Sequence, residues 1–488
     1  CLKLLLIEKI IIKNKIKKIY YHGRNFEIEK SIRLLSVNCK LGYKPKLIFT
    51  FPKSRLVYFF LGNIFFIKQL VKNLGLNKNL KKYSTISIFS YFVHFSNLNN
   101  KKFKSNLWGN LNKYFNNKKQ NINWFHFYVP SNQVPSSKKA NILQSNFNHN
   151  KYENHNFVNS YLSKNEIIKS FLFFYNLFIK NIFLLQPEEK FFENKISKVN
   201  FCFFLRGDFL SSLFGPTLIY NILNIMIFNN MLKNIPHQKL GLYIIENQSW
   251  EYCLIKFWRK YKHGKLIAYF NSSIRFWDLR YIRKKKQFIN KDENPDLYLL
   301  NNKIFKEEAN KQGFPKNKTF VVEALRYNKL LPLKKKIKNK KIIIIGDILF
   351  EETNYLLSFV NKITSELEKY KIFFKPHPTM TKKSILNLIE KYNYINITHV
   401  NSDRFKDFEF AICSNGTSAN LDCLIQNINF CSVKPYNSLN LYPVDRYQKY
   451  YQVGSPSELI KRIKNPKKNT NKFFFETTQS LSKFEKFF

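Results

Sequence analysis

Short apolar runs alternate with helical patterns from residue 341 to residue 463, and this alternation constrains the fold more than any other feature of the chain. The run 342–345 consists of four isoleucines, which is typical of a strand in a parallel sheet buried on both faces. Further strands are expected at 371–374, 395–399, 410–413 and 429–433, with helices at 353–369, 382–392, from 418 and at 456–463. Strands that are regularly followed by helices predict a doubly wound α/β domain.

Two polar turns follow strands of this domain. Pro376 and Pro378 fix the backbone on both sides of His377, directly after the strand at 371–374. The second turn, Ser414-Asn415-Gly416-Thr417-Ser418, lies between the strand at 410–413 and a helix. A small polar turn between a strand and a helix points backbone N–H groups at a phosphate, so the two turns predict a nucleotide or another phosphorylated ligand.

Gly346 and Asp347 end the strand at 342–345 and belong to the same edge of the predicted sheet. Ligands of doubly wound folds bind beyond the carboxyl ends of the strands, which places these two residues beside both turns. An alternative remains open for each turn. Ser and Thr are favoured as N-caps whether or not a ligand is present, and His377 is also suited to cap the helix that follows it.

A second α/β domain is expected before this one. Strands at 240–246 and 266–270 flank a helix whose apolar residues recur at helical spacing from Trp250 to Tyr261, and strands at 297–300 and 320–324 follow. Less regular α/β patterns precede them, with strands at 47–51, 86–93 and 124–129. A Ser/Asn-rich stretch at 130–159 predicts a disordered or inserted loop near 130–160, and two strongly apolar helices at 164–185 and 207–232 are expected to be buried.

The basic, polar stretch that ends at Lys341 predicts the boundary between domains, which gives an N-terminal domain at 1–330 and a C-terminal domain at 341–488. Glu246 ends a strand of the first domain and is the candidate general base. Asp208 and Asp278 are rival bases, and Arg275 and Arg280 are candidates for binding an anion. As an alternative, Glu246 or Glu251 is an acid in the first helical turn that complements the helix dipole.

Composition bounds the classes of function. The 82 Lys and Arg against 32 Asp and Glu give a net charge of +50, which favours an anionic partner or reflects a genome poor in G and C. The lysines are scattered and no RNA-binding signature is present, which argues against nucleic acid. A basic, aromatic-rich chain is suited to rest on an anionic membrane surface. The seven widely spaced cysteines include no CxxC pair and fit a reducing cytoplasm.

Several common motifs are missing from the sequence. It contains no HExxH, no clustered histidines at ligand spacing, no GxGxxG, no GxxxxGK[ST] and no serine nucleophile elbow, so no metal and no bound cofactor is expected. The chain begins at Cys1 without a methionine. A truncated reading frame is expected there in preference to a lipidated cysteine, and no signal peptide is predicted.

Lys375-Pro376-His377-Pro378 together with the turn 414–418 resembles the His-Pro and Ser/Thr motifs of GT-B glycosyltransferases of bacterial surface polysaccharides. That set includes polysialyltransferases, capsule Kdo transferases and glycerol-phosphate polymerases. The stretches 246–251, 263–267 and 275–281 look similar to an uncharacterised surface carbohydrate biosynthesis family. The resemblance covers roughly 240–433, and the acidic motif of the polysialyltransferases is not matched cleanly.

The resemblance implies a GT-B-like fold, in which two Rossmann-like doubly wound domains face a cleft. Its donor site would comprise Lys375, His377, Gly346, Asp347 and the turn 414–418, with Glu246 and His377 as catalytic residues. Arg275, Asp278 and Arg280 would bind the acceptor or an anion. The implied co-substrate is a nucleotide sugar, with CMP-activated acidic sugars or CDP-linked units as donors and a surface polysaccharide or lipid-linked glycan as acceptor.

Two other functions stay open at this point. A non-catalytic protein that binds glycans or polyanions would use the net charge of +50. A GT-B-shaped nucleotide-sugar epimerase would convert its donor without an acceptor. For the transferase, the expected location is the cytoplasm, with peripheral contact on the inner face of the membrane.

Overall fold

A computed structural model gives the structure of the chain. It describes residues 2–22, 26–45, 54–78, 84–93, 95, 102–131, 133–182, 192, 197–275, 278–330, 338–435, 438–443, 451–466, 475 and 480–488. The strand predicted at 47–51 and most of the basic stretch before Lys341 lie outside the described residues, as do Phe276 and Trp277.

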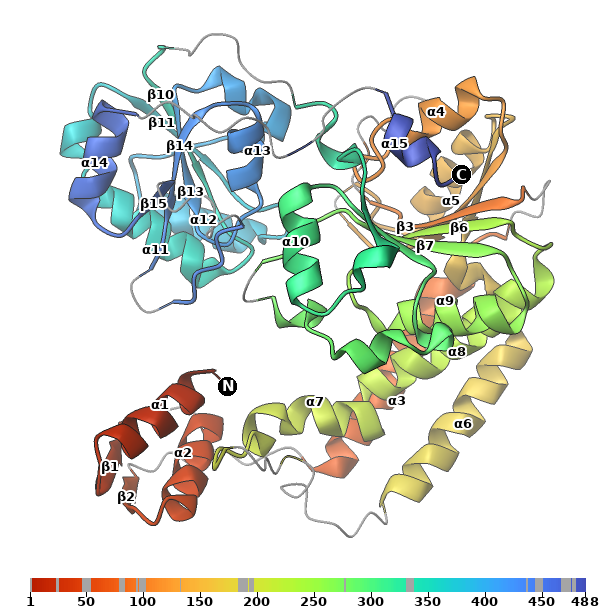
Figure 1. The fold of residues 1–488 in the computed structure, drawn as a ribbon, viewed down its shortest axis with the longest axis horizontal. Coiled ribbons are helices and arrows are strands. Elements are labelled where there is room, and N and C mark those ends of the chain that lie inside the picture. The colour runs from red at the N-terminus through yellow and green to blue at the C-terminus, as the bar shows by residue number, and fades with distance from the viewer. Residues whose placement is uncertain are drawn as a thin grey trace. The chain divides into compact units, whose positions relative to one another are not determined.

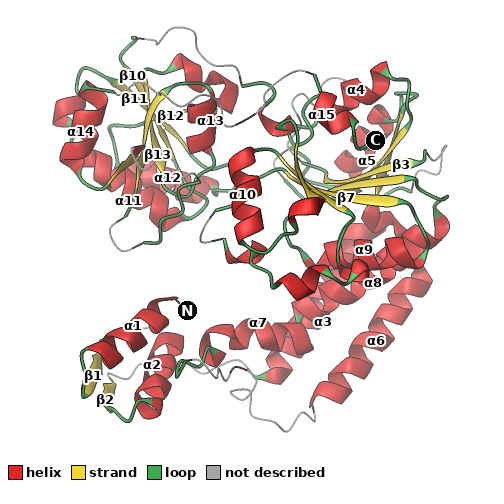
Figure 2. Ribbon diagram, viewed as in Figure 1, coloured by secondary structure: helices red, strands yellow, loops and turns green. Residues whose placement is uncertain are grey.

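The chain forms two compact units, one from Cys1–Lys78 and Phe157–Asn234 and the other from Asn79–Asn156 and Ile235–Phe488. The first is mainly helical, and the second contains both large sheets (Figure 2). The domain boundary that we predicted before Lys341 therefore falls inside the second unit, between its two sheets.

The helical unit begins with a small α/β element. Helices α1 (Leu2–Lys13) and α2 (Phe26–Asn38) pack beside a parallel pair of strands, β1 (Lys18–Tyr21) and β2 (Gly42–Pro45). Its core includes Leu4, Ile11 and Leu35. The amphipathic spacing of these residues along α1 and α2 places them on one face of each helix.

Four longer helices complete the unit: α3 (Arg55–Leu74), α6 (Lys164–Ile182), α7 (Cys202–Phe214) and α8 (Pro216–Asn234). The single helix predicted at 207–232 is wrong, because the chain breaks at Gly215, which is extended and precedes Pro216. Among the described residues no single helix has the length and apolar composition to cross a membrane, but the pair α7 and α8, bent by 45°, has them together.

The two apolar helices differ in burial. Helix α8 has nine buried residues, as its composition predicted, and it packs against α3, α6 and α7. In α6 only Ser170 and Phe174 are buried, so the prediction that this helix is buried is wrong. One side of α6 contacts neighbouring helices, and its other side carries exposed apolar residues.

The first large sheet has seven strands in the order β5-β4-β3-β6-β7-β8-β9, and the pairs from β4 through β9 are parallel. The strands are β3 (Ile86–Tyr91), β4 (Ile122–Phe127), β5 (Glu153–Phe157), β6 (Leu240–Ile244), β7 (Lys265–Phe270), β8 (Leu297–Leu300) and β9 (Thr319–Val321). Helices α4 (Leu111–Asn117), α5 (Ser137–Phe147), α9 (Ser249–Lys260) and α10 (Lys303–Lys311) connect them (Figure 1). The order reverses between β3 and β6.

The stretch 130–159 is largely ordered, which corrects the predicted disordered or inserted loop. It contains α5 and the edge strand β5, both with buried residues. The sequence of β5, Glu-Asn-His-Asn-Phe, has no apolar period, and several of its polar groups find hydrogen-bond partners inside the protein. For example, the Gln144 side chain donates to the His155 carbonyl at 2.9 Å, and Asn148 Oδ1 accepts from the His155 amide at 2.6 Å.

The second large sheet has six parallel strands in the order β12-β11-β10-β13-β14-β15. They are β10 (Lys341–Ile345), β11 (Lys371–Lys375), β12 (Asn396–Ile397), β13 (Phe410–Ser414), β14 (Asn429–Val433) and β15 (Gln452–Val453). Helices α11 (Phe350–Asn361), α12 (Lys382–Lys391), α13 (Ala419–Ile425) and α14 (Pro456–Lys464) lie between or after them. The order reverses between β10 and β13.

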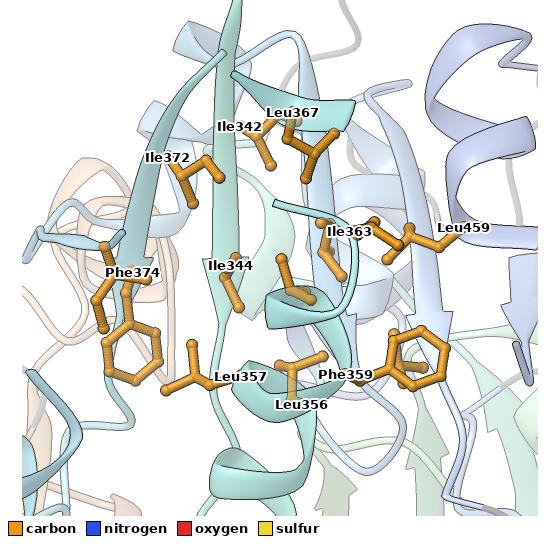
Figure 3. Close-up of a cluster of buried hydrophobic side chains, with 14 of the residues drawn as sticks. Ile342, Ile344, Leu356, Leu357, Phe359, Ile363, Leu367, Ile372, Phe374 and Leu459 are labelled. Carbon is orange, nitrogen blue, oxygen red and sulfur yellow. The ribbon is translucent and has the colours of Figure 1, made fainter. Parts of the chain in front are cut away.

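An aliphatic core fills one face of this sheet (Figure 3). Ile344 of β10 lies toward Leu356 and Leu357 of α11, and all three are at most 1% exposed. Ile342 of β10 lies beside Leu367. The isoleucines of β10 are covered on both faces of the sheet. A central strand of this kind needs apolar residues at every position, and this is why the run of four isoleucines predicted it. The predicted fold class, α/β with two Rossmann-like doubly wound sheets, is confirmed.

The end of the chain returns to the first sheet. Phe475 forms a bridge with Asn302, and α15 (Ser482–Glu485) lies where Phe484 contacts Tyr269 of β7 at a ring distance of 5.5 Å. The buried Glu323 carboxylate accepts from the backbone amides of Lys483 and Phe484 at 2.8 and 2.9 Å. The predicted C-terminal domain at 341–488 therefore does not pack as one block, because its last described residues contact Tyr269 of the first sheet and Glu323 after its last strand.

Candidate functional site

The points where the strand order reverses define where a site is expected. Beyond β10 and β13 lie Asp347 and the turn 414–418, and beyond β3 and β6 lies Glu246. The sheet topology therefore places the main predicted residues at the reversal points of both sheets.

Asp347 forms hydrogen bonds that stabilise the turn 414–418 of the second sheet. Its Oδ2 accepts a hydrogen bond from the Ser414 hydroxyl at 2.9 Å, and its own amide donates to Thr353 Oγ1 at 2.8 Å. A Cβ on Gly416 would lie 2.9 Å from the same Oδ2, so only glycine lets the turn approach the carboxylate this closely. Asp347 and Gly416 therefore shape the turn.

Two asparagine side chains form further hydrogen bonds that stabilise the turn 414–418. Asn420 donates to the carbonyls of Ser414 and Thr417, both at 2.9 Å. Asn415 donates to the Leu439 carbonyl at 3.3 Å, and its buried Oδ1 has no hydrogen-bond partner among the described residues. The turn is thus rigid and keeps one buried acceptor without a partner in the described part of the chain.

Ser418 occupies the N-cap position of α13, but its side chain forms no capping hydrogen bond. Its hydroxyl instead accepts from Nη2 of Arg326 at 3.3 Å. The N-cap alternative therefore does not account for Ser418.

Arg326 was not identified from the sequence, although it proves central. It follows β9 in a short 3-10 helix, Leu325–Tyr327. Its guanidinium donates a hydrogen bond to Ser418, in the turn that follows β13 of the second sheet. Burial opposes its charge, yet Tyr327, Asp422 and further neighbours, Glu246 among them, raise the pKa of Arg326 above its ordinary value. Nothing in the local sequence distinguishes this arginine, since its partners lie in remote segments.

His377 follows β11, and its Nδ1 is 2.8 Å from Thr379 Oγ1 and accepts from the Thr379 amide at 3.3 Å. Because the amide only donates, the neutral ring carries its proton on Nε2. Burial lowers the pKa of His377, while Asp347 acts in the opposite direction. A neutral imidazole with a donating Nε2 is therefore the form near neutral pH. Thr381 caps α12, so His377 does not serve as that cap.

A pocket of about 520 Å³ lies next to His377. Residues from the end of β11, the start of α12 and the segment after β12 line it, including Lys375, Lys382 and His399. This volume is within the usual range for a small-molecule site. Burial lowers the pKa of Lys375, and the nearby Asp422 opposes that change.

Glu246 lies two residues beyond β6 and is half-buried. Burial raises the pKa of its carboxyl group, while Arg280, Tyr91 and Arg326 act in the opposite direction. Glu251, by contrast, accepts from the amides of Glu246 and Gln248, both at 2.8 Å. Glu251 is therefore the acid of the first turn of α9. Glu246 precedes that helix and does not cap it.

The segment after β7 carries the predicted anion-binding residues. Asp278 and Arg280 form a two-pronged ion pair, with Nε to Oδ1 at 2.8 Å and Nη2 to Oδ2 at 2.7 Å. This pair engages one edge of the Arg280 guanidinium and both oxygens of Asp278. Arg280 remains close enough to influence Glu246.

Arg275 lies on the same segment and is influenced by Asp278 and by Asp347 of the second sheet. Burial lowers its pKa, and its buried Nε has no hydrogen-bond partner among the described residues. The structure thus brings Arg275 toward Asp347. The rival base Asp208 lies on α7 of the helical unit, outside the unit that holds these groups.

Within the described residues, no group of three or more His, Cys, Asp or Glu side chains is arranged to hold a metal ion. The charged groups described at the edges of the two sheets are instead arginines, lysines and carboxylates. Such a set is suited to bind a phosphorylated ligand and to accept a proton.

No protein-family model matches the chain, and no curated protein matches it. Among solved structures, UDP-GlcNAc 2-epimerase from Neisseria meningitidis bound to UDP-GlcNAc is 8% identical, with a TM-score of 0.44 over 81% of this chain and 94% of that chain. TarM is 10% identical, with a TM-score of 0.44 over 79% and 92%. The glycotransferase of kitacinnamycin is 7% identical, with a TM-score of 0.40 over 78% and 90%. Scores this low support no inference about the activity of this chain.

Proposed function

We propose that this protein is a GT-B glycosyltransferase that moves a sugar from a nucleotide donor to a glycan acceptor. One observation carries the proposal: Arg326 donates to Ser418 of the second sheet and lies within electrostatic range of Glu246 of the first. The proposal assigns the binding of the donor phosphate to this guanidinium and the acceptance of the proton to the Glu246 carboxylate. Transfer from a nucleotide sugar requires both.

In this mechanism Glu246 removes the proton of the acceptor hydroxyl as its oxygen forms a bond to the anomeric carbon of the sugar. The bond from that carbon to the phosphate oxygen breaks, and its electron pair leaves with the nucleotide. The Nε2–H of His377, the Arg326 guanidinium and the amides of the turn 414–418 stabilise the charge that develops on the phosphate. This arrangement corresponds to transfer with inversion.

The finer assignment follows the resemblance noted in the sequence. The proposed donor is a CMP-activated acidic sugar or a CDP-linked unit, bound by Lys375, His377, Gly346, Asp347 and the turn 414–418. The proposed acceptor is a surface polysaccharide or a lipid-linked glycan. The transferase would act in the cytoplasm, at the inner face of the membrane, and without a bound metal or cofactor.

A thermal-shift screen with CMP, CDP, UMP, UDP and GDP tests the donor site first. A nucleotide that binds the folded protein raises its melting temperature, by an amount that grows with concentration. Arg326→Ala should abolish the shift and Arg326→Lys should retain part of it, because lysine keeps the charge but not the planar guanidinium. Absence of any shift in the wild type would contradict the proposed donor site.

Activity is then tested with CMP-, CDP-, UDP- and GDP-sugars offered with a membrane lipid extract. The expected result is nucleotide release that depends on the extract and falls strongly in His377→Ala. Conversion of the sugar without the extract would instead identify an epimerase. Release that is the same in His377→Ala would overturn the role of the His-Pro turn. Salt-sensitive binding to polyanions without any turnover would support the non-catalytic alternative.

A further inference from the structure

Helices α3 and α6 form an antiparallel pair in the helical unit. Arg55, at the start of α3, donates to the carbonyl of Ile182, at the end of α6, at 3.1 Å. Phe66, further along α3, meets Phe171 of α6 at a ring distance of 6.2 Å. Positions that advance along α3 thus contact positions that recede along α6, so the two helices lie side by side.

Both helices use their inner sides to pack on α7 and α8 (Figure 1). Gly62 of α3 is buried, and a Cβ there would lie 3.0 Å from Phe174 of α6 and 3.2 Å from the carbonyl of Phe214. Ser170 and Phe174 are the buried residues of α6. The residues a half-turn away from these positions therefore point outward from the helical unit.

The outward side of the pair is apolar. Its most exposed residues include Phe60, Ile64, Ile67 and Val71 of α3, which are 50–70% exposed, and Ile168 and Leu172 of α6, at 58% and 62%. We call these six residues the α3–α6 face. Spacings of three and four residues align them along each helix. An isolated exposed apolar residue is ordinary, but a contiguous set along two helices marks a surface that binds something.

The charges around the α3–α6 face are positive. Helix α3 contains no acidic residue, and Lys68 is exposed among its apolar residues. On α6, Lys169 and Lys180 are exposed, and the one acidic residue, Glu166, accepts from Asn230 at 3.4 Å. Long lysine side chains can extend beside a buried apolar face while their ammonium groups reach phosphate oxygens.

We infer that the α3–α6 face docks on an anionic phospholipid bilayer, with its six apolar side chains at the boundary between headgroups and acyl chains and its lysines on lipid phosphates. An amphipathic helix with a basic rim is suited to lie in that plane. A second copy of the chain is a poorer occupant, because its own lysines would meet these lysines across the interface. The inference does not depend on the transfer chemistry proposed above.

Sedimentation of the full chain with vesicles tests the inference. Vesicles of equal parts phosphatidylcholine and phosphatidylglycerol should bind the protein, and vesicles of phosphatidylcholine alone should bind it much more weakly. The double variant Ile64→Gln/Ile67→Gln should bind the anionic vesicles about tenfold or more weakly. The matched control Ile142→Gln/Ile289→Gln alters two exposed isoleucines of the other unit and should bind like the wild type.

Tryptophan fluorescence distinguishes insertion of the α3–α6 face into the bilayer from electrostatic attraction to its surface. Phe60→Trp should show a blue-shifted emission on anionic vesicles and quenching by brominated acyl chains, whereas Ile142→Trp should show neither. Circular dichroism and the melting temperature establish that each variant folds like the wild type.

Three outcomes would overturn the inference. The first is equal binding of Ile64→Gln/Ile67→Gln and the wild type to anionic vesicles. The second is absence of quenching in Phe60→Trp. The third is a wild-type dimer in analytical ultracentrifugation that Ile64→Gln/Ile67→Gln converts to a monomer, together with no vesicle binding. That last result would assign the α3–α6 face to a second copy of the chain.

Discussion

The two sheets of the second unit share the strand order of a doubly wound fold, but they are stabilised differently. In the second sheet, Ile342 and Ile344 pack into an aliphatic core. In the first, the neighbouring strands β4 and β5 bury His126, His155 and Glu153. His126 Nε2 lies 2.9 Å from His155 Nδ1, and His155 Nε2 lies 3.1 Å from Glu153 Oε2. The second sheet is stabilised by the packing of apolar side chains. The first sheet is stabilised by packing and also by a connected network of buried hydrogen bonds.

The comparison shows what each kind of core requires. An aliphatic strand is stable against many apolar neighbours of suitable size. A buried polar strand loses stability for each group that lacks a specific partner, since a buried polar atom without one costs about 1–3 kcal/mol. The carboxylate of Glu153 meets this requirement through the side chains of Asn112, Asn116, Asn150 and His155.

The largest expected effect is on catalysis, and it should differ between a variant at the first sheet and a variant at the second. Under the proposed mechanism, Glu246→Gln at the first sheet should lower kcat about 10²- to 10⁴-fold with little change in KM, because it removes only the proton acceptor. His377→Ala at the second sheet should raise KM as well as lower kcat, because the same mechanism has His377 contact the bound donor. Steady-state kinetics with the donor found in the nucleotide screen measures both. A normal kcat in Glu246→Gln would remove it from the catalytic role.

The next effect concerns the polar network. Glu153→Ala should lower the free energy of unfolding by about 3–5 kcal/mol, because three side-chain amides and His155 would lose their shared acceptor and each buried donor left without a partner costs about 1–3 kcal/mol. Urea unfolding followed by circular dichroism measures the change. Glu366→Ala, which alters an exposed glutamate of the second sheet's domain, should change it by less than about 0.5 kcal/mol. Similar losses in the two variants would contradict the importance of the network.

Acid should weaken the first sheet more than the second. Burial lowers the pKa of His155 and holds that of His126 well below its ordinary value. The unfolded chain therefore binds protons at both sites at pH values where the folded protein does not. The stability they contribute is complete above about pH 6.5 and is lost as the pH falls toward the folded pKa values, by up to about 2.7 kcal/mol per pH unit for two protons.

NMR titration of the histidine ring protons measures the pKa of each imidazole directly. The expected result is that His126 and His155 stay neutral until the protein unfolds. Ordinary titration of His126 in the folded protein would contradict the buried arrangement.

The smallest effect tests the aliphatic sheet. Ile344→Val removes one buried methyl group and should lower the free energy of unfolding by about 0.5–1.5 kcal/mol. Surrounding side chains such as Leu356 and Leu357 can adjust in part, because no specific partner is lost. Urea unfolding under the conditions used for Glu153→Ala measures it. A loss as large as that of Glu153→Ala would mean that the two cores do not differ in the way proposed.

The second sheet could be predicted from the sequence because its signals are local. The isoleucines at 342–345 mark a strand buried on both faces, and the prolines around His377 mark a turn after the next strand, whatever lies elsewhere in the chain. The order of elements then placed Asp347, the turn 414–418 and Glu246 at the carboxyl ends of their strands. These inferences need only the period of apolar residues and the known connectivity of doubly wound folds.

Only the tertiary structure decided the remainder. The polar strand β5 is buried because its partners come from other segments of the chain. The outer side of α6 is exposed because, in the described part of the chain, the neighbouring helices pack on its inner side. Arg326 joins the site because the fold brings it to Ser418, which is 92 residues away in the chain. Burial and charge pairing depend on which distant segments meet, and a local sequence pattern does not contain that information.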